Sequence, residues 1–355
     1  SEVSRSIEAL AGTFSIPVSL IPGNAPAIAR GESVQVKIGG KVLIDGFVLS
    51  AEPFYSKDDC GMRIVGRDRA GDLIRSSAVH LGGQWRNARV DAIVKDLVRP
   101  FGLEVFVDTE LGAPLQDFKI AHGERVLDTM ARAARLRGVL VTTTTDADEF
   151  GGRPAGQIWL TRAGKKKFKG EIRRGMNVIS MEGIGTDENR HSSYTAYGQS
   201  NTVADFERAR GLKAKAVDGE IKRYCPLVIN ADGNTTEGEI QALVDHTLRV
   251  RRGHAFGFRY TVEGWTYGGE PWPLNQRVPI YDDIAGLDGA EWLICDVRQH
   301  CTLREGDVTD LTVRPVEAYD TAPLKTKVKR RNFGNKGNTT NHTRGPSDGA
   351  QGGVR

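Results

Sequence analysis

The hydrophobic positions of this chain follow two different periods, and the changes of period divide it into segments. Up to about Ala78, apolar residues alternate with polar ones, as at Val34 and Val36, and glycine pairs such as Gly39-Gly40 separate the runs. Alternation with period two is typical of half-buried strands, and a glycine pair favours a hairpin turn. The pattern predicts a first antiparallel β-barrel domain in residues 1–78.

In residues 79–165 the apolar positions change to helical spacing. Two stretches, 90–101 and 124–137, carry apolar residues three and four positions apart, which is the spacing of one helix face. Those residues are Ile93, Val94, Leu97, Val98 and Phe101 in the first stretch, and Val126, Leu127, Met130, Ala133 and Ala134 in the second. Strand-like runs lie beside them at 139–145 and 158–160. The pattern predicts a small α/β insertion domain.

Beyond Lys165 the strand pattern returns and continues to Tyr319. One helix interrupts it, starting at a capping box of Thr236 and Glu239. Its apolar face is predicted to comprise Ile240, Leu243, Val244 and Leu248. From 256 to 319 the strands are short and separated by turns, which suggests a small barrel or sandwich. We therefore expect a second β-barrel domain in residues 166–319, with one helix and with strands that can be exchanged with the first domain.

Composition places few limits on the function. The chain has 355 residues, a net charge of +4 and a sequence pI near 8.8, which is too mildly basic to indicate nucleic-acid binding. No apolar run approaches the ~20 residues that span a bilayer, and the first residues do not resemble a signal peptide. The four cysteines have no metal-site or disulfide spacing, so reduced thiols are expected, with Cys295 buried in a strand.

No group of residues predicts catalysis or cofactor binding. Cys295, His300 and Cys301 fall short of the four ligands of a structural zinc site. The segment 183–188 begins like a glycine-rich phosphate loop but lacks its third glycine and a following helix. Glu182, with Asp187 and Glu188 in that segment, could be paired carboxylates of a hydrolase, although carboxylates in a polar loop are common. We expect a structural protein without cofactor or metal.

Two basic segments and two tryptophans are candidate contacts for partners. The run Lys165–Lys169 is interpreted as a solvated linker, with nucleic-acid contact as the alternative. Residues 320–355 form a basic tail rich in Gly and Asn, with too few apolar residues to fold alone. Its basic cluster, a candidate site for an acidic partner, comprises Lys325, Lys327, Lys329, Arg330 and Arg331. Trp265 and Trp272 bracket a Gly/Pro turn and could anchor an interface or pack across the mouth of the barrel.

The order of these features resembles the baseplate hub proteins of Mu-like contractile-tailed phages, also called 43 kDa or P-type tail proteins. The resemblance covers roughly residues 1–320, and it rests on the order and number of its motifs, none of which is catalytic. Its residues are Ser4 to Glu8 with Ala11-Gly12, Val65 to Arg69 with Asp72 to Ile74, Gly83 to Asn87, Pro100 to Leu103, Ala133 to Leu140, and Gly264-Trp265 with Trp272.

The resemblance implies a homotrimer in the virion, made in the cytoplasm of the bacterial host. Three subunits with two similar barrels each would present six barrels, adapting a sixfold tail tube to a threefold puncturing spike and leaving a channel for DNA. The expected partners are the spike, the tail tube and other baseplate proteins, with DNA only in transit and no membrane insertion. We expect a channel wall without strong positive charge, because lysines would retain DNA. The alternatives are a tail-associated cell-wall hydrolase using Glu182 or Asp187, and a nucleic-acid-binding module.

Overall fold

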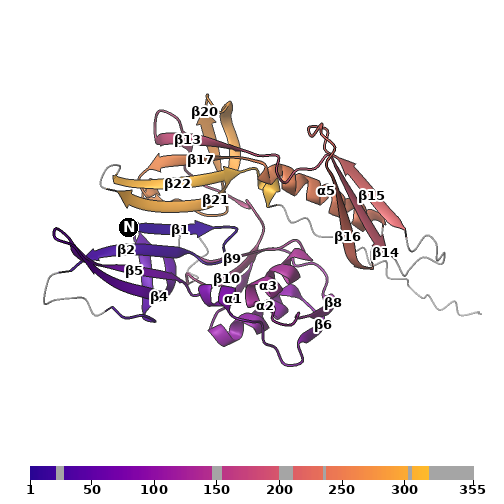
Figure 1. Ribbon diagram of the computed structural model, residues 1–355, viewed down its shortest axis with the longest axis horizontal. Coiled ribbons are helices and arrows are strands. Elements are labelled where there is room, and N and C mark those ends of the chain that lie inside the picture. Colours follow the sequence, from indigo (N-terminus) through magenta and orange to yellow (C-terminus); the bar gives the residue numbers. More distant parts are fainter. Residues whose placement is uncertain (21–27, 146–153, 200–210, 235–236, 303–305, 320–355) are drawn as a thin grey trace, which may run out of the picture. The chain divides into compact units, whose positions relative to one another are not determined.

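The computed structural model describes residues 1–20, 28–145, 154–199, 211–234, 237–302 and 306–319. Most of the described strands belong to one large sheet (Figure 1). In it, strands from the start of the chain lie beside strands from the end of the described part. Its first half is an antiparallel set from the start of the chain: β1 (Glu2–Ser6), β2 (Thr13–Ser19), β3 (Ser33–Ile38), β4 (Lys41–Tyr55) and β5 (Cys60–Asp68). The alternating burial of these strands follows the period-two pattern of the sequence.

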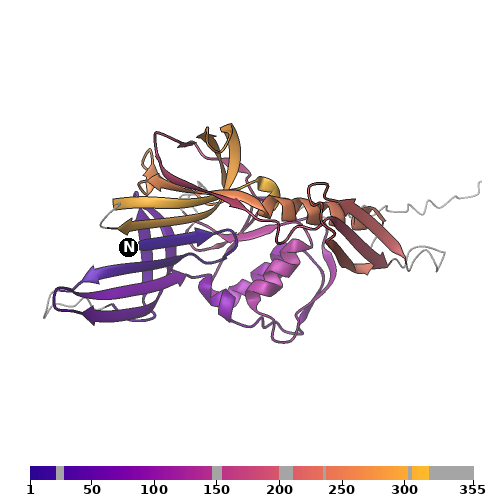
Figure 2. The same ribbon diagram turned by 45° about the horizontal axis from the view of Figure 1, so that its top comes forward.

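The second half of the large sheet comes mainly from the end of the described chain. Its strands are β11 (Lys166–Lys167), β12 (Ile172–Arg173), β13 (Val178–Gly185), β17 (Phe256–Glu263), β20 (Gln276–Asp282), β21 (Leu287–Thr302) and β22 (Gly306–Arg314). The hairpin β18 (Thr266–Tyr267) and β19 (Glu270–Pro271) follows β17, and the 3-10 turn η3 (Val316–Ala318) follows β22. These elements are orange to yellow or magenta in Figures 1 and 2.

Strand β1 joins the two halves. It pairs with β2 on one side and with β21 on the other, both antiparallel, with Glu2 opposite His300 and Ser6 opposite Asp296. The resulting path runs β13-β17-β22-β21-β1-β2-β5-β4-β3, and each neighbouring pair along it is antiparallel. Figures 1 and 2 both show the indigo strands of the first half beside the yellow strands of the second.

Two apolar cores lie on one face of this path, one beneath each half. Residues directly opposite each other in a ladder share a face, so the register assigns the faces without ambiguity. The core of the first half includes Val3, Phe14, Val36, Ile38, Leu43, Ile44, Val48 and Ile64. That of the second half includes Phe258, Tyr260, Val262, Trp272, Val278, Ile280, Ile294, Val297, Leu311 and Val313. The other face of the path is largely polar, but it also carries Leu293 of β21, which is buried in a further apolar cluster with Ile7, Cys295, Ala318 and Tyr319.

Residues 71–145 and 154–161 form the α/β segment. It contains α1 (Gly71–Arg75), α2 (Val90–Val98), the 3-10 turn η1 (Arg99–Phe101) and α3 (Val126–Arg135). Its strands are β6 (Gln84–Ala88), β7 (Val105–Val107), β8 (Leu115–Lys119), β9 (Leu140–Thr143) and β10 (Ile158–Thr161), arranged as the sheet β7-β10-β9 and the pair β6-β8. The predicted helix faces are confirmed, because Ile93, Val94, Met130 and Ala133 are fully buried in its core.

The described strands between residues 193 and 234 form a separate small sheet, in contrast to the expectation that they belong to the second barrel. β14 (Ser193–Gln199) lies between β15 (Leu212–Val217) and β16 (Pro226–Asn234), antiparallel to the first and parallel to the second. Helix α5 (Glu237–His254) packs on one face of it through Ile240 and Val244. The predicted apolar helix face is confirmed, because Leu243 and Leu248 also pack against this cluster. Thr236 of the proposed capping box lies outside the described residues.

The fold is mainly β with a smaller helical part, as expected. Within the described residues the strand pairing runs as an open path and closes no barrel, so the two-barrel architecture stays a prediction. All four cysteines are free thiols. Cys295 is buried as predicted, its Sγ lies 3.2 Å from the Thr312 carbonyl oxygen, and burial raises the pKa of the thiol to about 11.

Candidate interaction surfaces

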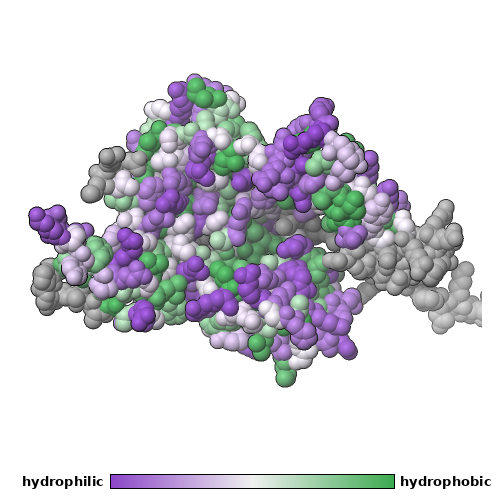
Figure 3. Space-filling view, in the orientation of Figure 1, coloured by the Kyte–Doolittle hydropathy of each residue, from purple (hydrophilic) through white to green (hydrophobic). Residues whose placement is uncertain are grey.

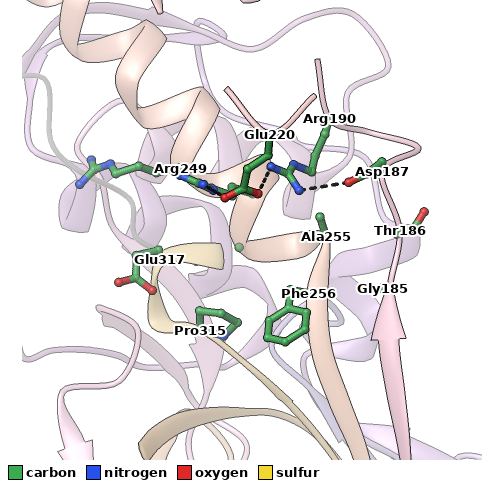
Figure 4. Close-up of a pocket in the computed structure, with 12 residues that line it drawn as sticks. Gly185, Thr186, Asp187, Arg190, Glu220, Arg249, Ala255, Phe256, Pro315 and Glu317 are labelled. Carbon is green, nitrogen blue, oxygen red and sulfur yellow. Dashed lines mark hydrogen bonds and ion pairs between the residues drawn. The ribbon is translucent and has the colours of Figure 1, made fainter. Parts of the chain in front are cut away.

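A pocket of about 710 Å³ lies where the small sheet and α5 join the large sheet (Figure 4). The end of β13, the end of α5, the start of β17 and the residues after β22 line it. Phe256 and Pro315 form its apolar side, and Phe256 is 49% exposed. Charged side chains from the loop after β13 and from the residue stretch after β15 form the opposite side.

Arg190 organises the charged side of this pocket. Its Nε and Nη2 donate to the two carboxylate oxygens of Asp218 at 2.8 to 3.1 Å, and the Asp218 side chain is only 1% exposed. Nη1 donates to Asp187 at 3.1 Å and Nη2 to Glu220 at 2.6 Å. Arg252 of α5 forms a further ion pair with Glu220. We call these five residues the Arg190 cluster.

The Arg190 cluster is a structural joint rather than a catalytic centre. Its three carboxylates are all bound by arginine, which leaves none of them as a free base or nucleophile. Backbone contacts reinforce the joint: a Cβ on Gly253 would come within 2.5 Å of the Ala318 nitrogen, so α5 touches η3 directly. The cluster therefore fixes the small sheet and α5 to the strands that precede and follow them.

A second candidate surface is the edge of the large sheet at β13. Three apolar side chains are exposed there or beside it: Met176 by 66%, Ile179 by 49% and Ile284 by 68%. A cavity of about 500 Å³ at this edge is lined by Ile179 and Ile284, and also by Arg174. In the described residues β13 pairs with β17 on one side only. On the face shown in Figure 3, hydrophobic residues, in green, are scattered between hydrophilic ones.

The two tryptophans have different surroundings. Trp272 is fully buried, with ring contacts to Phe168 and Tyr267, so within the chain it packs inside the core and has no surface for a partner. Trp265 is partly exposed, and its Nε1 donates to the His300 carbonyl oxygen at 2.9 Å. Trp265 remains a candidate contact. The basic tail candidates, 325–331, lie outside the described residues.

The residues considered for catalysis, metal binding and nucleic acids are dispersed or paired. Glu182 forms an ion pair with Arg259 at 3.0 Å and is 71% exposed. Among the described residues no group of three or more His, Cys, Asp or Glu side chains is arranged to hold a metal ion. In the run 165–169, Lys165 pairs with Asp108 and Lys167 with Glu291. No helix in the described part of the chain is long and apolar enough to cross a membrane.

Sequence reasoning missed both surfaces that the structure presents. The sequence contains Arg190 between Asp187 and His191, but its principal partners, Asp218 and Glu220, are about thirty positions away. The exposed apolar residues of the β13 edge carry a weak signal, since Ile179 departs from strict alternation at the bulge between Val178 and Ser180.

Comparisons with known proteins give a consistent result over most of the chain. Residues 1–68 match the N-terminal part of Mu phage baseplate assembly protein GpP-like proteins. Residues 70–148 match the second domain of baseplate hub protein gp44-like proteins. The baseplate hub protein gp44 of Escherichia phage Mu is 29% identical over 343 residues, which cover 94% of this chain and 88% of the phage protein.

Solved structures extend the similarity to the fold. The 43 kDa tail protein of prophage MuSo2 from Shewanella oneidensis is 30% identical, with a TM-score of 0.76 over 90% of this chain and 94% of that chain. A tail protein from Neisseria meningitidis MC58 has the same fold, with a TM-score of 0.74 at 21% identity over 91% of this chain and 94% of that one.

Proposed function

The chain belongs to the family of Mu-like phage baseplate hub proteins, and we propose that three copies of it close into a ring that joins the tail tube to the puncturing spike. The hub role is structural, and its place is the tail baseplate of a virion. The proposal concerns how this chain performs that role: as a homotrimer, with the spike, the tube and other baseplate proteins as partners, and with a channel through which DNA passes.

The continuous sheet is the observation that supports this proposal. One chain carries two apolar cores side by side beneath a single path of strands. Three copies in a ring would therefore present six such units, which matches a sixfold tube on one side. The threefold symmetry of the ring itself would match a threefold spike on the other side. A heterologous contact between identical subunits makes a closed ring when its rotation is 120°.

The two ends of the sheet path supply complementary surfaces for such a contact. Within the described residues, β13 and β3 each have one strand neighbour, so each has main-chain groups available at its outer side. Eight antiparallel steps separate them, so β3 and β13 run in the same direction. In a cyclic ring, β3 of one subunit would meet β13 of the next as a parallel pair, and Met176, Ile179 and Ile284 would be covered there.

Light scattering of the purified full chain over a concentration series tests the ring and its contact. We expect three times the 38.7 kDa mass of one chain. Ile179→Asp should shift the protein to monomer, because it places a charge in the apolar contact. Val217→Asp is the matched control, since Val217 is 64% exposed but lies on the small sheet. A strict monomer contradicts the trimer, and a trimeric Ile179→Asp variant contradicts the contact alone.

We also propose that the basic tail cluster, 325–331, contacts an acidic surface of the spike. The resemblance to hubs that bind a spike near their C-terminal part supports this assignment. Replacing its five basic residues with glutamine should weaken co-purification with the spike protein of the same tail without changing the mass of the free hub. Unchanged co-purification would contradict the assignment.

A further inference from the structure

A positively charged pocket of about 450 Å³ lies at the start of the edge strand β3. Its apolar lining comes from Phe47, Val48 and Leu49 of β4, and Leu49 is 41% exposed. Two arginines line it as well: Arg30, three positions before β3 begins, and Arg67 of β5. The register places Arg67 opposite Phe47, and Phe47 opposite the first residue of β3. We call this site the Arg30 pocket.

The positive charge of the Arg30 pocket is not neutralised within the described chain. Arg30 and Arg67 are both exposed, and no carboxylate of the described residues forms an ion pair with either of them. The third arginine of the lining, Arg75, is bound by Asp72 at 2.7 Å. Asp68 is buried, and burial raises the pKa of its carboxyl to about 7, so it is only partly ionised at neutral pH. The pocket therefore suits a carboxylate that lies next to an apolar group.

The start of β13, at the other end of the sheet path, exposes these two groups together. Ile284 is 68% exposed, and the side chain of its neighbour Asp283 is 75% exposed. Asp283 accepts hydrogen bonds from Arg174 at 2.9 and 3.2 Å, which hold the pKa of its carboxyl below the ordinary value. This carboxylate is therefore charged near neutral pH. Arg174 in turn forms a backbone bridge with Val178, the first residue of β13.

The directions of the two edge strands place both features at the same end of the subunit contact. In the proposed ring β3 of one subunit and β13 of the next run parallel, so the start of one strand lies beside the start of the other. The Arg30 pocket is at the first of these starts, and Asp283 with Ile284 is at the second. An antiparallel contact would instead place them at opposite ends of the pair.

We propose that Ile284 of each subunit inserts into the Arg30 pocket of the next subunit, where Asp283 binds Arg30. This inference rests on the proposed ring and names the residues that set its contact. An ionised carboxylate has about four acceptor positions, so Asp283 can accept from Arg30 while it remains bound to Arg174. Covering Ile284 removes apolar surface from water, and the ion pair fixes the register of the contact and excludes wrong partners.

Charge reversal on each side of the contact tests the pairing. Sedimentation velocity of the full chain measures the concentration at which half of the chains are trimeric. Arg30→Glu and Asp283→Arg should each raise this concentration at least tenfold, because each places like charges opposite one another. The variant with both changes should return to within threefold of the wild type. Arg86→Glu is the matched control, because Arg86 is an exposed arginine on β6 of the α/β segment, and it should assemble like the wild type.

Cross-linking provides a second measurement that does not depend on charge. Leu49→Cys combined with Ile284→Cys should give covalent trimers under mild oxidation, because the two positions would meet across every contact of the ring. Neither single variant should do so, and the two single variants also control for the exposed native thiols Cys60 and Cys301.

The outcomes separate this inference from the ring. Trimers that neither charge reversal weakens, single variants that the combination does not rescue, or a trimeric double-cysteine variant that forms no cross-link would each overturn the inference and leave the ring in place. A wild type that stays monomeric at every concentration refutes the ring, and the inference with it.

Discussion

Replacing Arg190 with methionine should destabilise the small sheet and α5 more than any exposed arginine replacement. Methionine retains much of the side-chain volume but donates no hydrogen bond to Asp218. Of the hydrogen bonds that the Asp218 carboxylate accepts in the structure, the three from Arg190 would be lost and the one from the Glu220 backbone N–H, at 3.2 Å, would remain. Because Asp218 is almost completely buried, removing its cation leaves an uncompensated charge. Breaking a buried pair on one side costs about 3–5 kcal/mol.

Urea unfolding followed by circular dichroism gives the free energy of unfolding, and native-state hydrogen exchange of β14 and β15 shows where stability is lost. Arg125→Met is the control, because its pair with Asp128 is exposed and such pairs contribute about 0.5 kcal/mol. The double variant Arg190→Met with Asp218→Asn should recover at least half of the loss, since it leaves no buried charge.

Three results would refute the reasoning about the Arg190 cluster. The first is a loss in Arg190→Met no larger than in Arg125→Met. The second is a double variant whose loss equals the sum of the two single losses, which would mean that the residues are not coupled. The third is faster hydrogen exchange in β2 and β5 with unchanged exchange in β14 and β15, because the stability would then be lost in the large sheet and not in the small sheet.

Two further predictions concern single buried side chains. Burial raises the pKa of Asp68 to about 7, so between about pH 4 and 7 the folded chain retains a proton that the unfolded chain has lost. The free energy of unfolding should therefore fall by up to about 1.4 kcal/mol per pH unit over this range, and the contribution of Asp68 should stay level above pH 7. Asp68→Asn should abolish this slope in urea unfolding at pH values below and above 7, and a variant with the wild-type slope would contradict it. Trp272→Ala should lower the free energy of unfolding by about 3–5 kcal/mol, because it removes a fully buried indole. Trp265→Ala should cost less, because its ring is partly exposed; equal losses in calorimetry would contradict this difference.

The elements that the sequence predicted well are those whose signal is local. Helices α2, α3 and α5 each show their apolar face within one stretch of sequence, and Ile93, Met130 and Ile240 are indeed buried. The strands of the last third were visible for the same reason, because Phe258, Tyr260 and Val262 alternate inward within β17. Local periodicity depends on nearest neighbours in the chain and therefore needs no knowledge of the fold.

The features that the sequence did not predict depend on partners far apart in the chain. Strand β1 buries Arg5 on the same face as Val3, and the Arg5 guanidinium donates to the Trp272 carbonyl oxygen at 2.7 Å. From the sequence alone, an arginine at this position would be expected on the exposed face of the strand. In the small sheet β14 pairs in parallel with β16, although β15 lies between them in the sequence. The alternation of apolar residues alone cannot distinguish these strands from strands of a barrel. Trp272 is buried because the hairpin β18–β19 folds against Phe168.

The way in which each part is attached bears on the proposed ring. β1 has main-chain hydrogen bonds on both of its edges, so the two cores of the large sheet share one continuous ladder. A ladder fixes the register of its strands, since a slip of one residue would turn every side chain to the opposite face. The small sheet and α5 are attached differently, through the Arg190 cluster and the contact of Gly253 with η3. A ring that matches sixfold and threefold partners needs the two cores of each subunit at a fixed spacing, and β1 provides that restraint within five residues.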